Sequence, residues 1–556
     1  MTVRLFLTLL AAASFTACAG PAPAPVTSDA AAPAAAATPE EAAAWWAHVS
    51  FLAADEMRGR ETGSPEHRKA ANYVADHLTR AGVQPAGTNG FLQPVTFRSR
   101  KIDEAKSSLA LVRRGKESTV VLGDEATFGM RIDPAPAVEA PLVFAGHGLA
   151  IPEVEHDDFA GLDVKGKVVV YLSGSPRGVP AALSAHYQSA GERWATLRRL
   201  GAVGTIAVAN PKSMDVPWER SAPNRLNPAM ALADASLDET AGQQLSVSFN
   251  PAKAERLFEA SAHTFAEILK LADEGKALPH FALASSVKAS VAFDSQIVES
   301  QNVAGIVRGS DPDLADEFVV LTAHLDHVGI GAAIDGDAIY NGAMDNASGI
   351  ATLLESAKAV VAARPKRSVV FVAVTAEEKG LLGSRYYALN PTVPKDGIVA
   401  NINMDMFLPL FPMKTLMVLG LDESDLGDDV RAVTTAMSVG VQADPEPQRN
   451  RFIRSDQYSF IREGVPALAM KVGYEDGSPE ATIAADWTRE RYHGPADDLD
   501  QPIDRRAAAD FTGMIGDLCV RVANRDTRPQ WKDGSFFKRF ARPVATESTV
   551  ERPDAR

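Results

Sequence analysis

Six side chains that can bind a metal ion or carry a proton lie in the second half of this chain. They are two imidazoles and four carboxylates: His324, Asp345, Glu377, Glu378, Asp405 and His493. A set of this size can hold two metal ions around one water molecule. Nitrogen and oxygen donors without a thiolate suit zinc, which manganese or cobalt could replace in vitro.

Three apolar segments end directly at these side chains. The segments are residues 318–323 before His324, residues 369–376 before Glu377 and Glu378, and residues 398–404 before Asp405. Short apolar runs rich in β-branched residues, without twofold alternation, are typical of strands covered by helices on both faces. In open α/β sheets, ligands bind beyond the carboxyl ends of such strands. The three strand ends therefore predict one shared site in an α/β fold.

Asp345 and His493 come from segments of another kind. Residues 340–349 read as a turn that leads into a helix with apolar residues at helical spacing. A carboxylate near a helix start is favoured by the helix dipole, and its two oxygens can bridge two cations. His493 lies in a loop, so its reach to the other residues depends on the fold. Taken singly, each residue could be a cap, a packed histidine or a solvated charge, but their joint placement favours a metal site.

Five segments of this region resemble, in order, the motifs of the co-catalytic di-zinc exopeptidases. They are residues 324–326, 342–349, 377–384, 403–405 and 492–493. This family includes bacterial leucyl aminopeptidases and glutamate carboxypeptidase, with transferrin receptor and glutaminyl cyclase as relatives of altered function. The resemblance covers about residues 302–499 and lacks no ligand position. Met344 departs from the acidic or small residue of many relatives, at a position that is not a ligand.

The resemblance implies two zinc ions per chain and a division of the ligands between them. His324 and Asp405 would bind one zinc, and Glu378 and His493 would bind the other. Asp345 would bridge the two ions, and the peptide bond that follows it would be cis.

The resemblance also implies that Glu377 is the general base, which takes a proton from the water and gives it to the leaving amine. From its position two residues after His324, Asp326 is expected to accept the second imidazole N–H and to fix the tautomer. Tyr492 resembles a residue that donates a hydrogen bond to the oxyanion in some relatives. A packed aromatic side chain at this place is an equal alternative for Tyr492.

Two further predictions concern residues next to the presumed ligands. Asp497 or Asp498 could orient His493 in the way proposed for Asp326 and the first histidine. His327 is expected to be structural or to support a ligand, because the metal positions are already filled.

The predicted function is a zinc-dependent exopeptidase, namely an aminopeptidase that removes the amino-terminal residue of short peptides. A carboxypeptidase or dipeptidase is the alternative, since Arg449, Arg451 and Arg454 could clamp a substrate carboxylate, although ordinary loop charges would look the same. A receptor-like scaffold without catalysis is disfavoured, because non-enzymatic relatives have lost ligands that are intact here.

The beginning of the chain predicts export. Residues 1–18 read as a signal peptide, and residues 14–18 resemble a bacterial lipoprotein cleavage site in which Phe15 replaces the usual Leu. Lipidated Cys18 would anchor a periplasmic or outer-membrane lipoprotein, with simple secretion as the alternative. Residues 19–39 are rich in Ala and Pro and suit a linker between the anchor and a folded body.

The folded body is predicted to be discontinuous. Residues 40–99 and 296–524 would form the peptidase domain, with a central, mostly parallel mixed sheet sandwiched by helices. Residues 100–295 contain many short strand-like runs and resemble the protease-associated domain that is often inserted in this family. Residues 525–556 form a polar tail.

Composition narrows the partners further. The chain has 556 residues, a net charge of -15 and a pI near 5.3, which disfavours nucleic acid as a partner. Charge does not decide the substrate, and peptides are expected from the family resemblance alone. Of the two cysteines, Cys18 lies in the leader, so no intrachain disulfide is expected after processing. Cys519 falls in an apolar stretch and is expected to be a buried free thiol. Composition does not reveal the oligomeric state.

Overall fold

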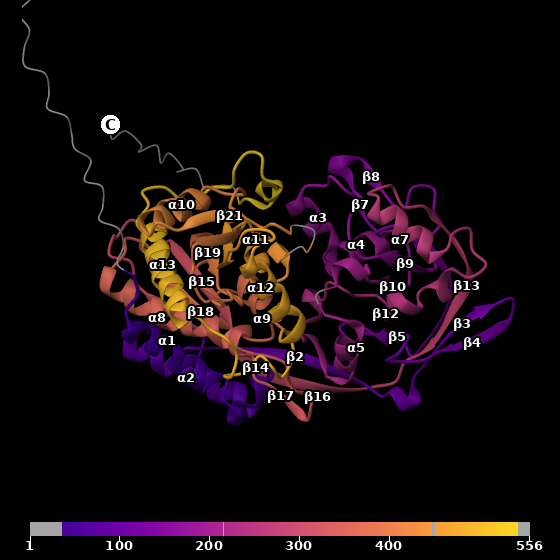
Figure 1. Ribbon diagram of the computed structural model, residues 1–556, viewed down its shortest axis with the longest axis horizontal. Helices are drawn as coiled ribbons and strands as arrows, with labels where there is room; N and C mark the ends of the chain where they lie inside the picture. The colour runs from indigo at the N-terminus through magenta and orange to yellow at the C-terminus, as the bar shows by residue number, and fades with distance from the viewer. Residues whose placement is uncertain (1–35, 215, 447–448, 450, 543–556) are drawn as a thin grey trace, which may run out of the picture.

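The computed structural model describes residues 36–214, 216–446, 449 and 451–542. The predicted signal peptide, Cys18 and most of the predicted linker lie outside these residues, so export and lipidation stay predictions. None of the described helices combines the length and the apolar character needed to cross a membrane. Two lobes lie side by side in Figure 1, one built on each of two large sheets.

The first lobe is built on a 10-stranded mixed sheet. Its strands, in spatial order, are β11 (Ala229–Leu232), β2 (Leu92–Ile102), β14 (Phe293–Val307), β18 (Ser368–Val374), β15 (Phe318–His324), β19 (Ile398–Asn403), β22 (Ala467–Val472), β20 (Thr415–Leu419) and β21 (Gly440–Ala443), with β1 (Gln84–Pro85) paired to β14. The central strands β18, β15, β19 and β22 are parallel. By contrast, β14 runs antiparallel to β18 and β2, and β20 runs antiparallel to β22 but parallel to β21. The three apolar runs of the sequence are therefore the adjacent strands β15, β18 and β19.

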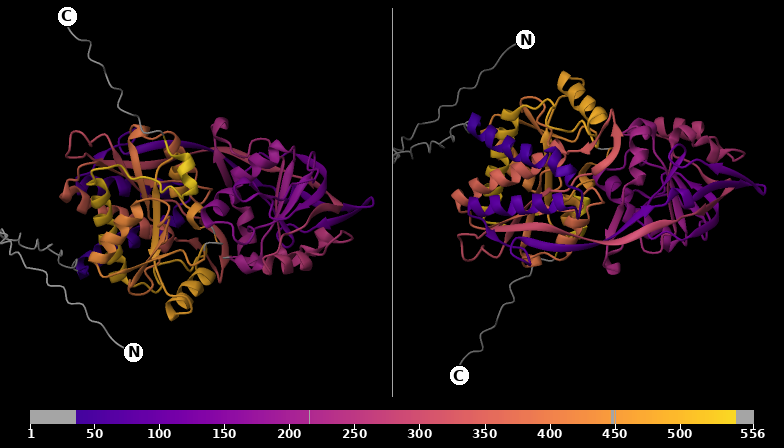
Figure 2. Two further views of the ribbon diagram at one scale, coloured as in Figure 1. Left: turned by 90° about the horizontal axis from the view of Figure 1, so that it is seen from above. Right: turned by 90° about the horizontal axis from the view of Figure 1, so that it is seen from below.

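Helices cover both faces of this sheet (Figures 1 and 2), which confirms the predicted α/β sandwich. On one face lie α1 (Pro39–Leu52), α2 (Pro65–Ala81), α8 (Ser348–Ala363) and α13 (Arg505–Ala523), and on the other lie α9 (Leu382–Leu389) and α11 (Gln457–Ile461). Alternate residues of β15 enter the two cores, Val319 on the first face and Val320 on the second. Both are fully buried, which explains why the strand sequence shows no polar alternation. Two more helices, α10 (Leu426–Ala436) and α12 (Pro479–Glu490), complete the lobe. Cys519, on α13, is buried and free, as predicted.

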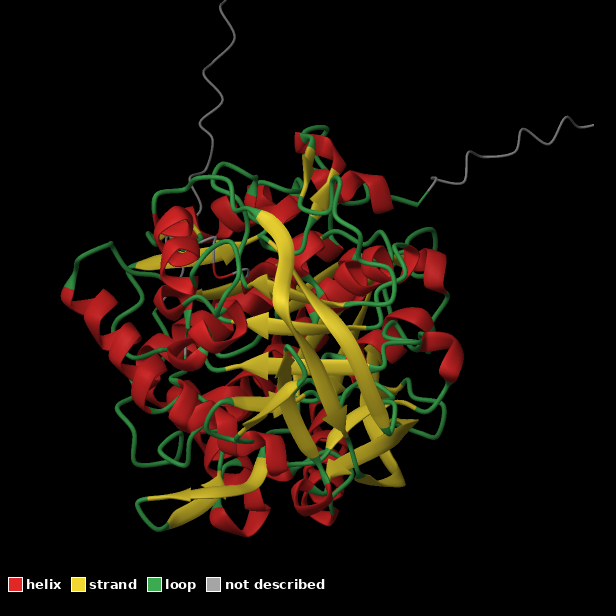
Figure 3. Ribbon diagram, turned by 90° about the vertical axis from the view of Figure 1, so that its right-hand side faces the viewer, coloured by secondary structure: helices red, strands yellow, loops and turns green. Residues whose placement is uncertain are grey.

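The second lobe has its own 8-stranded sheet and its own core. The strand order is β4 (Lys116–Val120), β3 (Ser108–Arg113), β13 (His280–Ser290), β6 (Ala137–Ala145), β9 (Val168–Leu172), β10 (Gly204–Val208), β12 (Leu245–Phe249) and β5 (Ala126–Phe128). Its helices include α3 (Ala181–Gln188), α4 (Ala190–Arg199), α5 (Trp218–Ser221), α6 (Glu255–Phe258) and α7 (Phe265–Asp273). This lobe faces the viewer in Figure 3.

The long strands β2 and β14 connect the lobes. They pair with each other from Leu92 opposite Val303 to Ile102 opposite Phe293, so the chain leaves and re-enters the first lobe along one ribbon. The predicted insert boundaries, residues 100 and 295, fall inside these two strands. In addition, β11 returns from the insert to pair with β2 in the first sheet. The resemblance of the insert to a protease-associated domain stays a prediction.

Local capping rules define helix α2. The Ser64 hydroxyl accepts the His67 N–H, Pro65 occupies the first helical position, and Gly82 ends the helix with φ 89°. The buried face of the helix includes Ala70, Val74 and, unusually for a helix of this kind, the imidazole of His67. His67 is fully buried, and its Nδ1 lies 3.1 Å from Gln301 Nε2.

The burial of His67 predicts a pH dependence of folding. Burial, and then the charges of Arg60 and Arg68, lower the pKa of His67 to about 3. Because this is below the unfolded value of about 6.5, the unfolded chain binds a proton that the folded chain rejects. The stabilisation is therefore fully present above about pH 6.5 and decreases below it, by about 2 kcal/mol at pH 5. We expect His67→Gln to lose less stability than the wild type between pH 7 and pH 5 in urea unfolding. The part-exposed His263, changed to Gln, serves as the control; equal pH dependence of all three proteins would contradict the assignment.

Candidate metal centre and active site

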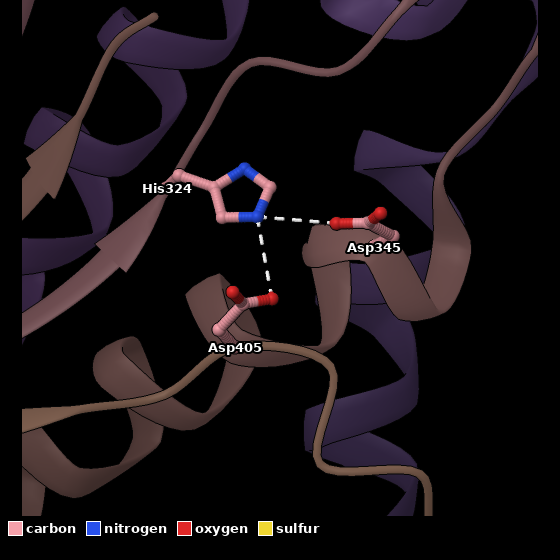
Figure 4. A group of neighbouring side chains, drawn as sticks. All are labelled: His324, Asp345 and Asp405. Carbon is pink, nitrogen blue, oxygen red and sulfur yellow. Dashed lines mark ion pairs between the residues drawn. The ribbon is translucent and has the colours of Figure 1, made fainter. Parts of the chain in front are cut away.

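The carboxyl ends of β15 and β19 and the start of α8 bring three donors together. His324 is the last residue of β15, Asp405 follows β19, and Asp345 lies in the turn of residues 343–347 before α8. His324 Nε2 lies 3.1 Å from Asp345 Oδ1 and 3.4 Å from Asp405 Oδ1, as Figure 4 shows. His324 and Asp345 are buried, so the contact is shielded from water.

A second group of donors meets the other oxygen of Asp345. His493 Nε2 lies 3.2 Å from Asp345 Oδ2 and 3.1 Å from Glu378 Oε2. Each oxygen of Asp345 thus faces a different histidine, and the loop that carries His493 reaches the strand ends. The structure brings all five predicted ligands into one cluster.

The donor atoms of this cluster fit a cation. His324 Nδ1 lies 3.0 Å from the carbonyl oxygen of Asp326, so Nδ1 is assigned the proton and the lone pair of Nε2 faces the carboxylate oxygens. Among the described residues, His324 Nε2 and Glu378 Oε1 are buried without a partner in hydrogen-bond geometry. Buried polar atoms without partners are rare in folded proteins, and a bound cation would satisfy both of these. The described residues therefore contain two groups that could hold a metal ion, His324 with Asp345 and Asp405, and His327 with Asp345 and Glu378.

Burial and neighbouring charges together shift the pKa values of two carboxyl groups in this cluster. Burial raises the pKa of Asp345, but the facing imidazoles of His324 and His493 outweigh this effect and hold the pKa well below its ordinary value. Burial raises the pKa of Glu377 well above its ordinary value. His324 lowers this pKa, whereas the negative charge of Glu378 raises it further.

Asp326 contacts His324 and the two glutamates through different atoms. Its carboxylate does not accept the His324 N–H; instead, it accepts the backbone N–H of Glu377 at 3.1 Å, that of Glu378 at 3.4 Å and the Thr62 hydroxyl at 3.0 Å. The expected acceptor of the His324 N–H is therefore Asp326, but through its backbone carbonyl oxygen and not through its side chain. The reason is the direction of the chain after β15, which turns the Asp326 carbonyl back to the histidine and the side chain across to the end of β18. Asp326 thus fixes the backbone of the two glutamates.

Asp497 holds the turn that carries Asp345. Its carboxylate accepts the backbone N–H groups of Met344 at 2.8 Å and Asp345 at 3.0 Å. Among the described residues, neither Asp497 nor its neighbour Asp498 forms a hydrogen bond with His493, contrary to the earlier expectation. The Asp345–Asn346 peptide bond is cis, as predicted.

The comparisons with known proteins agree with this geometry. Residues 302–518 match the model of Peptidase family M28. These residues, called the M28 domain below, are similar to that family. The predicted resemblance to the zinc exopeptidases is confirmed at the level of this match.

Curated relatives of the M28 domain include two fungal proteins. The probable leucine aminopeptidase 2 of Aspergillus fumigatus is 33% identical over 217 residues, which are 37% of this chain and 40% of that protein. The protein of the same name from Aspergillus oryzae is 25% identical over 440 residues, 76% of this chain and 71% of that protein. The chain thus spans less than half of the first relative and somewhat more than two thirds of the second.

A solved structure extends the likeness to most of the chain. The aminopeptidase from Aneurinibacillus sp. strain AM-1 superposes with a TM-score of 0.52 at 19% identity, covering 86% of this chain and 92% of that one. At this identity, the likeness establishes the fold alone. The predicted α/β architecture of the M28 domain is confirmed.

Tyr492 and His327 also contact residues of the donor cluster. The Tyr492 ring stacks on that of His493, with centroids 3.9 Å apart, and burial raises the pKa of its hydroxyl. Its role as an oxyanion donor stays a prediction. His327 Nδ1 lies 2.7 Å from Glu378 Oε1, inside the cluster. Sequence reasoning set His327 aside because the ligand positions were filled, although its place three residues after His324 was a visible signal.

A cavity of about 880 Å³ opens beside the cluster. Glu377, Asp345, Asp405, Tyr492 and His493 line it on the side of the cluster. Its other walls include the apolar side chains of Met406, Leu408, Phe411, Met417, Leu419 and Val472. A cavity with an apolar wall and a few convergent polar groups is the usual form of a substrate site.

The three arginines proposed as a carboxylate clamp also line this cavity. Arg449 Nε lies 2.7 Å from Glu446, and Arg451 lies 2.9 Å from Asp444 and 2.5 Å from Glu446. Two of the arginines are therefore already engaged by acidic residues of their own loop, which favours the explanation as ordinary loop charges.

The insert contacts both sides of the cluster. Arg131 donates to the carbonyl oxygen of Glu378 at 2.9 Å, and Arg220 donates to the carbonyl oxygen of Tyr492 at 2.7 Å. Met214 and Pro217 of the insert line the same cavity as Glu377. The second lobe thus supports the backbone of the site and forms part of its wall.

Proposed function

We propose that this protein is a zinc-dependent aminopeptidase that removes amino-terminal residues from peptides with two zinc ions and a glutamate base. One observation carries the proposal. The two oxygens of Asp345 lie 3.1 Å and 3.2 Å from the Nε2 atoms of two different histidines, beside a cavity that Glu377 also lines. The match of residues 302–518 to a peptidase family supports the same reaction.

In this proposal, His324 and Asp405 would hold one zinc, Glu378 and His493 would hold the other, and Asp345 would serve both. This division follows the distances within each group of donors. The zinc ions, when bound, lower the pKa of a shared water and polarise the scissile carbonyl.

The residues of the chain supply the proton transfers and the orientation. Glu377 takes the proton of the attacking water and delivers it to the leaving amine. Asp326 keeps Glu377 and Glu378 at the strand end through their backbone N–H groups. The Tyr492 hydroxyl donates a hydrogen bond to the scissile carbonyl oxygen as negative charge develops on that oxygen.

The shape of the cavity supports a peptide substrate whose first side chain is apolar. The wall formed by Met406, Leu408, Phe411 and their neighbours is apolar and adjoins Asp405. Burial of a large apolar side chain there would contribute about 1.5–3 kcal/mol to binding. Peptides that begin with such residues are therefore the proposed substrates.

A specific observation keeps a carboxypeptidase or dipeptidase as the second candidate. Lys471 lines the same cavity, and no residue in the described part of the chain forms an ion pair or hydrogen bond with its ammonium group. A substrate carboxylate would be a suitable partner for this cation.

Peptides with one blocked end distinguish these candidates. We expect the zinc-loaded protein to release the first residue from Leu-Gly-Gly amide, which has a free amino group, and to leave acetylated Leu-Gly-Gly intact. Removal of zinc by a chelator should abolish the release, and added zinc should restore it. Mass spectrometry of the products is the measurement.

Release of the last residue from the acetylated peptide would favour the second candidate. Cleavage of unblocked Leu-Gly alone would indicate a dipeptidase. Failure of the zinc-loaded protein to cleave any of these peptides would favour a scaffold without catalysis.

A further inference from the structure

We infer that His327 is an additional nitrogen donor at the metal position faced by Glu378 and His493. The inference rests on the proposed function to the extent that a metal ion binds there. It gives this position two imidazoles, whereas the position of His324 and Asp405 has one. The two metal positions would then differ in affinity.

The first observation is the direction of the two imidazoles. His327 Nδ1 lies 2.7 Å from Glu378 Oε1 and 3.9 Å from Asp345 Oδ2. His493 Nε2 approaches the same two carboxylates at 3.1 Å and 3.2 Å. The rings are tilted to each other with centroids 5.8 Å apart. Both histidines therefore face one pair of carboxylates from different sides.

The second observation is that this close contact lacks the geometry of a hydrogen bond. His327 Nδ1 and Glu378 Oε1 have no partner in hydrogen-bond geometry among the described residues, and neither has His327 Nε2. His324 Nε2 is in the same situation between its two carboxylates. A neutral imidazole with both nitrogens buried and unpaired is costly, and coordination of Nδ1 to a cation would offset that cost.

The third observation is that the backbone holds this imidazole in place. His327 is fully buried, and its backbone forms a parallel bridge with Glu61. Gly342, with φ 62°, starts the turn that carries Asp345, and a Cβ at this position would lie 2.5 Å from His327 Cγ. The ring therefore fills the space that the missing Cβ leaves, directly beside the bridging carboxylate.

These contacts predict an order of metal binding. Imidazole nitrogen favours zinc over harder cations such as magnesium or manganese, so the position with two imidazoles should take up the first zinc ion. The position of His324 and Asp405, with one imidazole, should fill second.

A crystal structure of the zinc-loaded wild-type protein, with zinc located by anomalous scattering, tests the inference directly. We expect a zinc ion about 2.0–2.2 Å from His327 Nδ1. Two bound zinc ions with His327 Nδ1 more than about 3 Å from both would overturn the inference and leave the proposed function intact. A protein that binds no zinc would instead overturn the proposed function.

Zinc titration against a competing chelator tests it in solution. We expect His327→Leu to weaken one of the two binding steps by about 10-fold to 100-fold or more and to leave the other within a few-fold. His263→Leu, a change at a part-exposed histidine of the insert, is the control and should titrate like the wild type. Two unchanged steps in folded His327→Leu would overturn the inference; if the variant does not fold, the wild-type crystal structure decides.

Discussion

Replacing Glu377 with Gln will lower kcat by about 100-fold to 10,000-fold while both zinc ions remain bound. Glutamine keeps the size and the backbone contacts of the residue, including the N–H that donates to Asp326. It cannot accept the proton of the attacking water at neutral pH. Because Glu377 lines the cavity beside the donors without belonging to either group of metal-binding residues, metal content should not change. Steady-state kinetics on free-amino peptides, with metal analysis of the same samples, measures both effects.

Glu423→Gln is a matched control for this experiment. Burial raises the pKa of Glu423 as well, but its carboxylate contacts Ser535, and it does not line the cavity. We expect wild-type kcat from this control. Wild-type kcat from zinc-loaded Glu377→Gln would exclude Glu377 as the base.

Replacing Asp345 with Asn will remove at least one zinc ion and lower kcat/KM by about three orders of magnitude. One oxygen of Asp345 faces His324 and the other faces His493, so in the proposed function the carboxylate would serve both metal positions. An amide offers one oxygen and places an NH₂ group, which cannot bind a cation, at the other position. Loss of the metal's contribution to the transition state amounts to several kcal/mol, and about 4 kcal/mol corresponds to a factor of 1,000. Zinc per chain after dialysis and kcat/KM are the two measurements.

Asp429→Asn provides the control for a buried aspartate outside the site. Asp429, on α10, forms ion pairs with Arg521 at 2.9 Å and Arg525 at 3.1 Å near the end of α13. This variant should keep its zinc and its activity even if it is less stable. An Asp345→Asn protein that retains two zinc ions per chain would show that Asp345 is not the bridge.

The sequence was sufficient to predict the central sheet and most of the site. The runs before His324, Glu377 and Asp405 are apolar because both faces of β15, β18 and β19 are covered by helices. Neighbouring parallel strands end at the same edge of a sheet, so polar residues placed directly after such runs must lie close together. Periodicity and position along the chain were enough for this step, since both depend on local structure and burial.

The tertiary structure decided how each atom contributes. His493 joins the cluster only because its loop packs against the strand ends, and the contacts of Arg131 and Arg220 come from an insert whose position no local pattern encodes. Asp326 and His327 are close to His324 in sequence, yet the turn after β15 directs the Asp326 carboxylate to the glutamates and the His327 ring to Glu378. The sequence alone therefore determined which residues meet at the edge of the sheet, because strand ends are set by local burial. Which atoms face each other depends on loop direction and on packing between distant segments, and only the tertiary structure decides these.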